Sequence, residues 1–459
     1  MYTIESQETI VAQCTPKGAG ALALIRVSGA FAFDLINRFV HLASRKHIID
    51  CPTHTIEYGA FVDDQARAID YALFFLMRAP RTFTGEDTIE ISCHNNQFIV
   101  DTIIATLVSA GARLAAPGEF SKRAVLHGKI DLVQAEAVHD LITASSGRAM
   151  QQSLAQLQGT LSAELARLEK TLVHADVLIQ ASFEFLDDDA IEFAPQVSAL
   201  LGESITKTAQ LLATHDTQKQ IRTGVRIALV GSVNVGKSTL FNALVGDNRA
   251  IVSDIAGTTR DAIEAGLYVD GLYWTLIDTA GLRLTNDRIE AEGIRRSREQ
   301  AHIADIVLLV FDQSRAMTEA ENQIYTELLQ VYGDRILVIA SKHDCAMLTH
   351  VIDARAPDYT VSMHDEQSMR ILKDALKKRV DLLLHRSDTP FAINARHAKA
   401  LIAVQEHIKQ AQQLLTTERA YELVSVHVRD ALQELSQLTG KSVSEATLDA
   451  VFHEFCVGK

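Results

Sequence analysis

The eight residues Gly231–Ser238 constrain the fold of this chain more than any other segment. They run Gly-Ser-Val-Asn-Val-Gly-Lys-Ser and fit the pattern G-x-x-x-x-G-K-[ST]. The apolar run Val225–Val230 before them predicts a buried strand, and a helix is expected after them. Glycines in such a loop let main-chain N–H groups surround phosphate, and the helix N-terminus adds a positive dipole end. The segment therefore predicts a phosphate-binding loop.

Three further apolar runs follow the loop, at 272–277, 306–311 and 336–340, and helical stretches alternate with them. Such alternation is typical of a doubly wound sheet. We therefore predict a P-loop nucleotide domain over residues 221–385.

The residues between and after these strands indicate which nucleotide is bound. Asp278-Thr279-Ala280-Gly281 follows the strand ending at Ile277, and Gly257–Asp261 contains threonines that can close over Mg²⁺. We expect Lys237 to reach the β and γ phosphates and Ser238 to ligate Mg²⁺. This order of motifs predicts a Ras-like switch GTPase. The only tryptophan, Trp274, lies close before this switch in the sequence and is expected to sense the nucleotide by fluorescence.

Base recognition is expected after the strand ending at Ala340. Ser341-Lys342-His343-Asp344 stands where GTPases usually have N-K-x-D, and Ser362 is expected in the short loop behind the base. Asp344 can accept hydrogen bonds from guanine N1–H and the 2-amino group together. Since Ser341 replaces an amide, we expect GTP binding to be weaker by about 1 kcal/mol, with guanine preference retained.

The pattern leaves open which residue activates water. Leu282 occupies the position where Ras-type enzymes have a water-orienting Gln. Glu290 is a candidate for this task, and the alternative is a solvated surface glutamate. Asn234 is a candidate ligand of a monovalent cation near the phosphates, and the alternative is a plain polar loop residue.

The segments on either side of the nucleotide domain predict two further domains. Four of the seven prolines and several short strand-like runs fall before residue 120, which predicts an α/β domain over residues 1–120. Leucines at 154, 157, 161, 165, 168 and 172 predict one face of a long amphipathic helix. Helical periodicity returns after Pro390, so residues 121–220 and 386–459 are expected to form one helical domain that the nucleotide domain interrupts.

Composition narrows the environment and the partners. The net charge of −14 argues against broad, non-specific binding of nucleic acid. Neither a signal peptide nor a membrane-spanning run is recognisable, and the five scattered cysteines include no CxxC pair. A protein of the reducing cytoplasm is expected.

Short stretches in a fixed order resemble a known family over nearly the whole chain. The chain is similar to the MnmE (TrmE) family of tRNA modification GTPases, which are potassium-activated and dimerise. The stretches that carry this resemblance, besides the nucleotide motifs, are Ile25–Gly29, Thr82–Asp87, Pro117–Ala124, Gly128–Leu132, Gln134–Ala137 and Phe455–Lys459.

The resemblance implies a role for many residues. Glu290 corresponds to the catalytic glutamate, acting with Lys237 and Thr259. It implies Mg²⁺ at Ser238 and Thr259, K⁺ at Asn234, Ser253, Ile255 and Thr258, and 5-formyltetrahydrofolate at Arg26, Glu90, Lys129 and Lys459. The implied GTP-binding residues are Asn234, Val235, Gly236, Lys237, Ser238, Thr239, Ser253, Asp254, Ile255, Ala256, Gly257, Thr258, Thr259, Asp278, Thr279, Ala280, Gly281, Ser341, Lys342, Asp344 and Ser362.

The resemblance also implies a reaction and partners. The N-terminal domain resembles tetrahydrofolate-binding domains and is expected to dimerise. With a flavoprotein subunit of the MnmG type in a heterotetramer, the family adds an aminomethyl or carboxymethylaminomethyl group at C5 of the wobble uridine of certain tRNAs. Pairing of two G domains stimulates GTP hydrolysis, which drives a conformational change.

Two other functions remain as alternatives. One is a regulatory GTPase in ribosome assembly without folate chemistry, against which the folate-type stretches argue. The other is a folate-dependent one-carbon transferase with a vestigial G domain, against which the intact loop and Asp278 argue.

Overall fold

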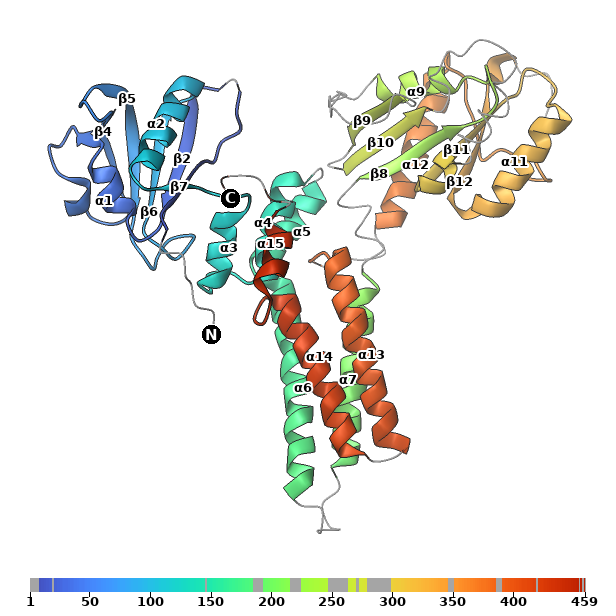
Figure 1. Ribbon diagram of the computed structural model, residues 1–459. Coiled ribbons are helices and arrows are strands. Elements are labelled where there is room, and N and C mark those ends of the chain that lie inside the picture. The colour runs from blue at the N-terminus through green and yellow to red at the C-terminus, as the bar shows by residue number, and fades with distance from the viewer. Residues whose placement is uncertain are drawn as a thin grey trace. The chain divides into compact units, whose positions relative to one another are not determined.

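The structure is a computed structural model that describes residues 8–18, 20–144, 147–184, 193–214, 224–246, 263–269, 272–278, 299–345, 351–384, 390–417, 420–453, 455 and 458. The chain divides into two compact units. One consists of residues 1–139, 157–205 and 400–459, and the other of residues 140–156 and 206–399. Figure 1 shows the elements of each unit.

The N-terminal part of the chain forms an α/β layer (Figure 1). In the described residues its sheet has seven strands in the order β3-β4-β5-β6-β2-β1-β7, with β1 and β7 parallel and the other neighbours antiparallel. Alternate residues of β2, β5 and β6 pack against helices α1 and α2. These side chains together form the hydrophobic core on one face of the sheet. The strands are β1 (Ile10–Gln13), β2 (Leu22–Ser28), β3 (Val40–Leu42), β4 (Thr55–Val62), β5 (Ala68–Met77), β6 (Thr88–His94) and β7 (Arg113–Leu114), and the helices are α1 (Ala32–Asn37), η1 (Ile48–Asp50) and α2 (Gln97–Ser109).

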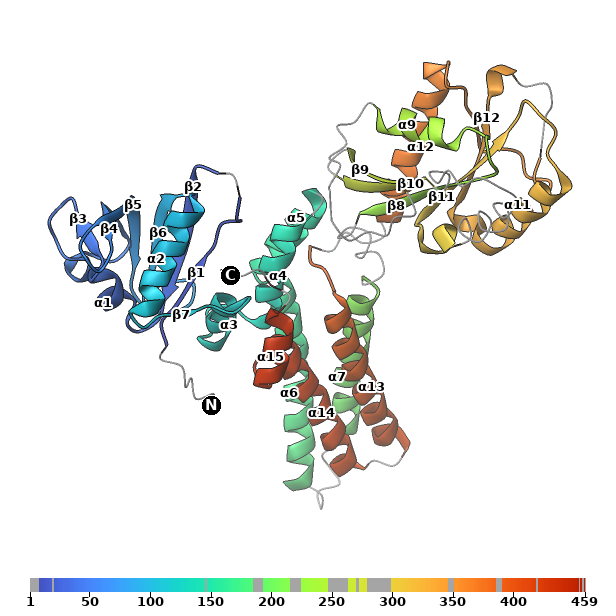
Figure 2. The ribbon, with the colours of Figure 1, turned by 45° about the horizontal axis from the view of Figure 1, so that its top comes forward.

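The helices on both sides of the nucleotide domain form one bundle, as predicted. Helices α6 (Thr160–Glu184) and α14 (Tyr421–Thr439) lie side by side, as do α7 (Ala194–Leu212) and α13 (Ala395–Thr417) (Figures 1 and 2). Gln180 Nε2 donates to Ser425 Oγ at 3.1 Å, and Gln405 Nε2 donates to Ile205 O at 3.5 Å. The remaining helices are α3 (Glu119–Leu126), α4 (Leu132–Thr143), α5 (Gly147–Leu157) and α15 (Glu445–Phe452).

The prediction of one long helix through the leucine stripe is wrong. Helix α5 ends at Leu157 and α6 begins at Thr160, because Gly159 adopts a left-handed φ of 94° between them. Leu154 on α5 is exposed, whereas Leu161 and the three later leucines on α6 are buried. A stripe of leucines at helical spacing does not reveal a break, since the spacing continues across the glycine.

The nucleotide domain is the predicted doubly wound sheet. Its described strands have the order β13-β12-β11-β8-β10-β9, and all neighbours are parallel except β9 and β10. Alternate residues of β8 point to opposite faces: Ile227 and Leu229 pack in one core with α9 and α12, and Ala228 and Val230 in the other with α11. The elements are β8 (Val225–Val230), α9 (Lys237–Val245), β9 (Ile263–Val269), β10 (Leu272–Asp278), β11 (Ile306–Asp312), α11 (Glu319–Tyr332), η2 (Gly333–Arg335), β12 (Ile336–Ser341), η3 (His343–Cys345), β13 (Tyr359–Thr360) and α12 (Glu366–Leu384).

Two features of the described residues bear on the environment of the protein. Within the described ranges, no helix combines the length and apolarity needed to cross a bilayer. Among the described cysteines, Cys14, Cys51, Cys93 and Cys345 are not joined by disulfides.

Candidate nucleotide site and its setting

The phosphate loop lies at the carboxyl end of β8. This strand is the topological switch point of the sheet, because β10 pairs with one of its edges and β11 with the other. Doubly wound folds place their ligand sites at this point. A Cβ atom on Gly231 would lie 2.1 Å from the main-chain oxygen of Val310, so only glycine fits there. Gly236 has a φ of 100° and directly precedes α9, and Asn234 has a φ of 62°. These backbone angles form the turn that opens the helix N-terminus.

The Lys237 side chain folds back over the loop that carries it. Its Nζ donates to Gly231 O at 2.7 Å and Ser232 O at 2.6 Å, and the residue is buried. Burial lowers the pKa of Lys237, and the charge of Asp278 opposes that shift. Ser238 and Thr239 are exposed on the first turn of α9. The loop thus holds one cationic and two hydroxyl groups where phosphate and metal are expected.

Ser341 ties the base-recognition segment to the phosphate loop. It ends β12, is buried, and its Oγ lies 2.5 Å from Val235 O and 2.9 Å from Phe311 O. A hydroxyl has one proton, so it can satisfy only one of these two carbonyl acceptors at a time. An asparagine amide would bring two N–H donors. The replacement of the Asn of N-K-x-D by Ser341 therefore removes one hydrogen-bond donor from this position.

Lys342 bridges the phosphate loop and a neighbouring strand. Its Nζ donates to Asn234 O at 3.0 Å and to the Asp312 carboxylate at 2.6 Å. Burial tends to raise the pKa of Asp312, but hydrogen bonds from Lys342 and Ser314 outweigh it and lower the pKa. The sequence analysis missed Asp312, although an aspartate at the end of a parallel strand was a visible signal.

Asp344 and Ser362 meet at the same edge of the sheet. Asp344 is exposed, and a hydrogen bond with the Ser362 hydroxyl lowers the pKa of its carboxyl group. Ser362 is buried, and its Oγ accepts from His364 N at 3.2 Å. The Asp344 carboxylate is therefore kept in its charged form beside the loop that contains Ser362, as recognition of a guanine base requires.

Helix α11 holds the phosphate loop from the other side. Ser232 N donates to the Tyr325 hydroxyl oxygen at 2.8 Å, and Tyr325 is buried. Arg315 and the Thr318 capping box fix Glu321 on the same helix. A tyrosine on an apolar helix face gives no sequence signal for this contact, so only the fold reveals it.

Several predicted site residues lie outside the described residues. These are Ser253, Asp254, Ile255, Ala256, Gly257, Thr258, Thr259, Thr279, Ala280, Gly281, Glu290 and Lys459. Asp278 is described: it is buried at the end of β10, opposite Leu229 of β8.

Trp274 lies away from the phosphate loop, although it is close to the switch in the sequence. It pairs with Val225, at the start of β8, whereas Asp278 pairs with Leu229 near the phosphate loop. An extended strand advances about 3.3 Å per residue, so Trp274 lies roughly 13 Å from the end that carries Asp278. Its fluorescence is therefore a poor direct sensor of phosphate.

Arg26 and Glu90 face each other on β2 and β6 of the N-terminal sheet. Their side chains form an ion pair at 2.7 Å and are one-fifth exposed. The Arg26 guanidinium also lies over the rings of Phe83 and Phe120, at 5.6 and 5.3 Å from the ring centres. Lys129 is exposed and donates to Pro80 O at 2.7 Å, in the loop that leads to Phe83.

A buried polar network joins three of the stretches that carry the family resemblance. The Arg123 guanidinium lies 2.9 Å from the Glu86 carboxylate and also donates to Glu8 O. Ser28 Oγ donates to the same Glu86 carboxylate at 2.8 Å. The network joins β2, the Thr82–Asp87 loop and α3. The sequence pattern alone assigned no role to Glu86 or Arg123.

The C-terminal segment packs against the N-terminal sheet within the same unit. A Cβ atom on Gly458 would lie 2.4 Å from Gln13 O, at the end of β1. Phe452 O similarly approaches Gly118, leaving room for glycine alone. Gly458 therefore lies at the end of β1, the strand that pairs with β2, which carries Arg26.

A phosphate loop at the switch point of a parallel sheet, beside an exposed aspartate after β12, defines a P-loop GTP hydrolase. The family model for the GTP-binding protein TrmE N-terminus matches residues 9–129, and the model for the MnmE helical domain matches residues 132–456. The chain belongs to the MnmE family of tRNA modification GTPases.

Individual relatives agree with the family models. The tRNA modification GTPase MnmE of Geobacillus thermodenitrificans is 36% identical over 464 residues, covering 98% of this chain and 99% of the relative. The protein of the same name from Salinibacter ruber is 37% identical over 476 residues, covering 99% and 100%. Among solved structures, the G domain of T. maritima FeoB is 24% identical to this chain, with a TM-score of 0.25, and the match covers 34% of this chain and 97% of the FeoB chain.

Proposed function

We propose that this protein hydrolyses GTP to drive the addition of an aminomethyl or carboxymethylaminomethyl group at C5 of the wobble uridine of certain tRNAs. The observation that carries the proposal is the similarity to tRNA modification GTPases along the whole chain. The flavoprotein subunit of the MnmG type is the proposed partner, in a heterotetramer in the cytoplasm. The domains proposed for this work are residues 1–120, 121–220 with 386–459, and 221–385.

In the proposed nucleotide site, Mg²⁺ is held by Ser238 and Thr259, and Asp278 contacts it through water. Potassium is held by Asn234, Ser253, Ile255 and Thr258. Two described residues support this arrangement: Ser238 is exposed on the first turn of α9, and Asn234 is exposed at the tip of the loop. Glu290 orients the attacking water, and Lys237 stabilises charge on the phosphates.

The proposed one-carbon donor is a formylated tetrahydrofolate bound at Arg26, Glu90, Lys129 and Lys459. Folates combine carboxylates with a flat ring system. Arg26 and Lys129 offer cationic groups, and Phe83 offers a partly exposed aromatic ring nearby. The approach of Gly458 to β1 supports a role for its neighbour Lys459.

The proposed assembly is a homodimer formed through the N-terminal domain. Ile56, Tyr58, Tyr71 and Leu73 are all more than 40% exposed, and they lie on the face of β4 and β5 opposite the core. Tyr58 and Tyr71 stack at 6.2 Å. A second copy would cover this apolar strip, which otherwise faces water.

Mass spectrometry of tRNA from cells lacking this protein tests the proposal. The C5 group on the wobble uridine should disappear and should return with the native gene. The Glu290→Ala variant should bind GTP but restore little of the modification. An unchanged level of wobble-uridine modification in cells without the protein would refute the proposed reaction and favour a regulatory role in ribosome assembly. A regulatory GTPase of that kind should also show no binding when the protein is titrated with folate.

A further inference from the structure

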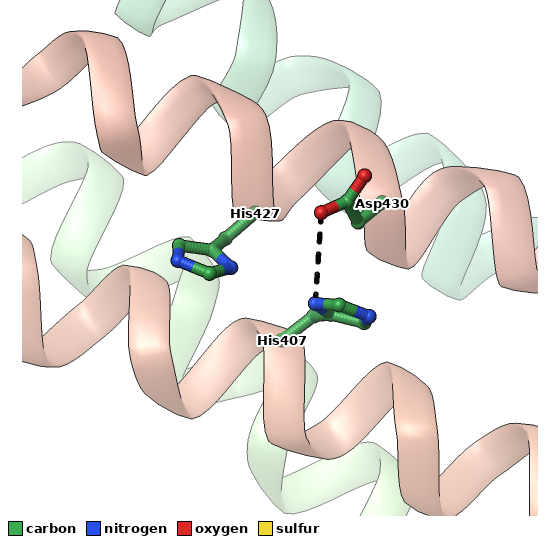
Figure 3. Close-up of side chains that lie close together, drawn as sticks. All are labelled: His407, His427 and Asp430. Carbon is green, nitrogen blue, oxygen red and sulfur yellow. Dashed lines mark ion pairs between the residues drawn. The ribbon is translucent and has the colours of Figure 1, made fainter.

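A polar cluster in the helical bundle lies apart from both sites described above. His407 is on α13, and His427 and Asp430 are on α14 (Figure 3). Residues three apart share a helix face, so His427 and Asp430 both point toward His407. Ligand-type atoms of the three side chains all lie within 4.8 Å of one another. Three groups that can bind a metal ion thus converge from two neighbouring helices.

The two histidines have unsatisfied nitrogen atoms. Nδ1 of His407 and Nδ1 of His427 are buried and have no hydrogen-bond partner among the described residues. The Asp430 carboxylate lies 3.8 Å from His407 Nδ1, an ion-pair distance that is too long for a hydrogen bond. The two imidazole rings lie 5.9 Å apart between centres. A buried nitrogen without a partner is unfavourable, and a metal ion would supply the missing partner to both.

We propose that His407, His427 and Asp430 bind a divalent transition-metal ion of the zinc class. Two imidazole nitrogens and one carboxylate oxygen form a known type of zinc ligand set with an open fourth position. Mg²⁺ and Ca²⁺ prefer oxygen ligands throughout, so the set selects against the magnesium of the GTPase site.

The geometry is close to what such an ion requires. In tetrahedral coordination with zinc–nitrogen bonds of about 2.0 Å, ligand atoms lie roughly 3.4 Å apart. The ligand atoms in this cluster lie at most 4.8 Å apart, so small rotations of the imidazole rings would bring them to the distances that the ion requires. The side chains of His407 and Asp430 are 30% and 45% exposed, so water can reach the fourth position.

A bound ion would link α13 to α14. These are the helices that lead from the nucleotide domain to the C-terminal segment. The site would thus fix the register between the two helices without touching the nucleotide or folate residues. The alternative is a simple ion pair between His407 and Asp430, and the experiment distinguishes the two.

Full-length protein that has been stripped of transition metals and is kept in Mg²⁺ should be titrated with Zn²⁺ by calorimetry and with Co²⁺ by visible absorption. We expect one ion per chain, and each of His407→Gln, His427→Gln and Asp430→Asn should weaken binding by about tenfold or more. The matched control is His174→Gln, because His174 is an exposed histidine on α6 of the same bundle. It should bind like the native protein.

Thermal unfolding keeps the test valid if a substitution weakens the fold. Zn²⁺ should raise the melting temperature of the native and control proteins but not of the three ligand variants. Equal Zn²⁺ binding by the native protein and the ligand variants would overturn the proposal, as would native protein that binds no Zn²⁺. A thiolate band in the Co²⁺ spectrum would also overturn it, since it would move the ion to a cysteine.

Discussion

The Ser341 hydroxyl lies 2.5 Å from the main-chain oxygen of Val235 and so joins the base-recognition segment to the phosphate loop. The same hydroxyl lies 2.9 Å from Phe311 O, so one proton is shared between two strands and a loop. Together with Lys342, whose Nζ donates to Asn234 O at 3.0 Å, Ser341 therefore connects the two halves of the nucleotide site. Any change at this position should affect both phosphate and base binding.

Removal of the Ser341 hydroxyl is expected to weaken nucleotide binding. Ser341→Ala leaves the Val235 and Phe311 oxygens without this donor, which costs about 1 kcal/mol and raises the Kd for GTP about fivefold. Titration with a fluorescent GTP analogue measures this. Thr416→Ala is the control, because Thr416 also donates a hydroxyl proton to a carbonyl but lies exposed on α13. Unchanged affinity of Ser341→Ala would show that the link does not support the site.

Asp344 is expected to choose the base. The Asp344 carboxylate can accept hydrogen bonds from two guanine N–H groups, whereas the amide of Asp344→Asn cannot accept both. This variant should therefore bind GTP about a hundredfold more weakly. The amide can instead donate to a xanthine oxygen, and binding of xanthosine triphosphate should improve. Competition titrations with the two nucleotides measure the exchange. The neighbouring variant His343→Ala should keep the preference for guanine, and retained preference in Asp344→Asn would move base recognition elsewhere.

Potassium is expected to accelerate GTP turnover by about tenfold or more over sodium, since a cation beside the phosphates stabilises developing charge. Asn234→Ala should abolish the difference. Because Asn234 has a positive φ that strains alanine, Asn234→Gly is needed as a second variant and should behave alike. Val233→Ala, the exposed neighbour, should retain the difference. Equal native rates in the two salts would contradict the proposed cation site.

Acid is expected to weaken the nucleotide domain through Glu321. The hydrogen bond from Arg315, together with the Thr318 cap, lowers the pKa of Glu321 from 4.5 to about 2. A depressed pKa means that the carboxylate stabilises the fold fully above pH 4.5, and that this stability is lost as the pH falls toward 2. Allowing for solvent screening, Glu321→Gln should lose about 1 kcal/mol at neutral pH and flatten the acid side of the stability curve. Melting temperatures between about pH 2 and pH 7 measure it, because this range spans both pKa values of Glu321. Glu319→Gln, exposed on the same first turn, should follow the native curve.

The buried pair of Glu86 and Arg123 is expected to stabilise the N-terminal domain. Arg123→Met leaves the Glu86 carboxylate without its main partner and should cost about 3–5 kcal/mol in urea unfolding. The double variant with Glu86→Gln should recover part of the loss. Arg67→Ala breaks an exposed pair with Asp63 and should cost less than about 1 kcal/mol. An equal loss of unfolding free energy in Arg67→Ala and Arg123→Met would show that the buried pair does not stabilise the domain more than the exposed pair.

The sequence by itself determined the elements that depend on local pattern. The strand before Gly231, the helix after Gly236 and the strands ending near Asp278 and Ser341 follow from apolar runs and from glycines that the loop requires. Such signals are short-range, because strand alternation, helix periodicity and left-handed glycines are properties of neighbouring residues. The nucleotide domain and the family were therefore visible in the order of residues alone.

Only the tertiary structure decided which distant residues meet. The network of Glu86 and Arg123 has no local signature, because its residues lie far apart in the chain. Nor does the packing of Gly458 beside Gln13, or the convergence of His407 with His427 and Asp430. These contacts depend on sheet register and helix packing, in which residues far apart in the chain become neighbours through burial of faces that the sequence marks only as apolar.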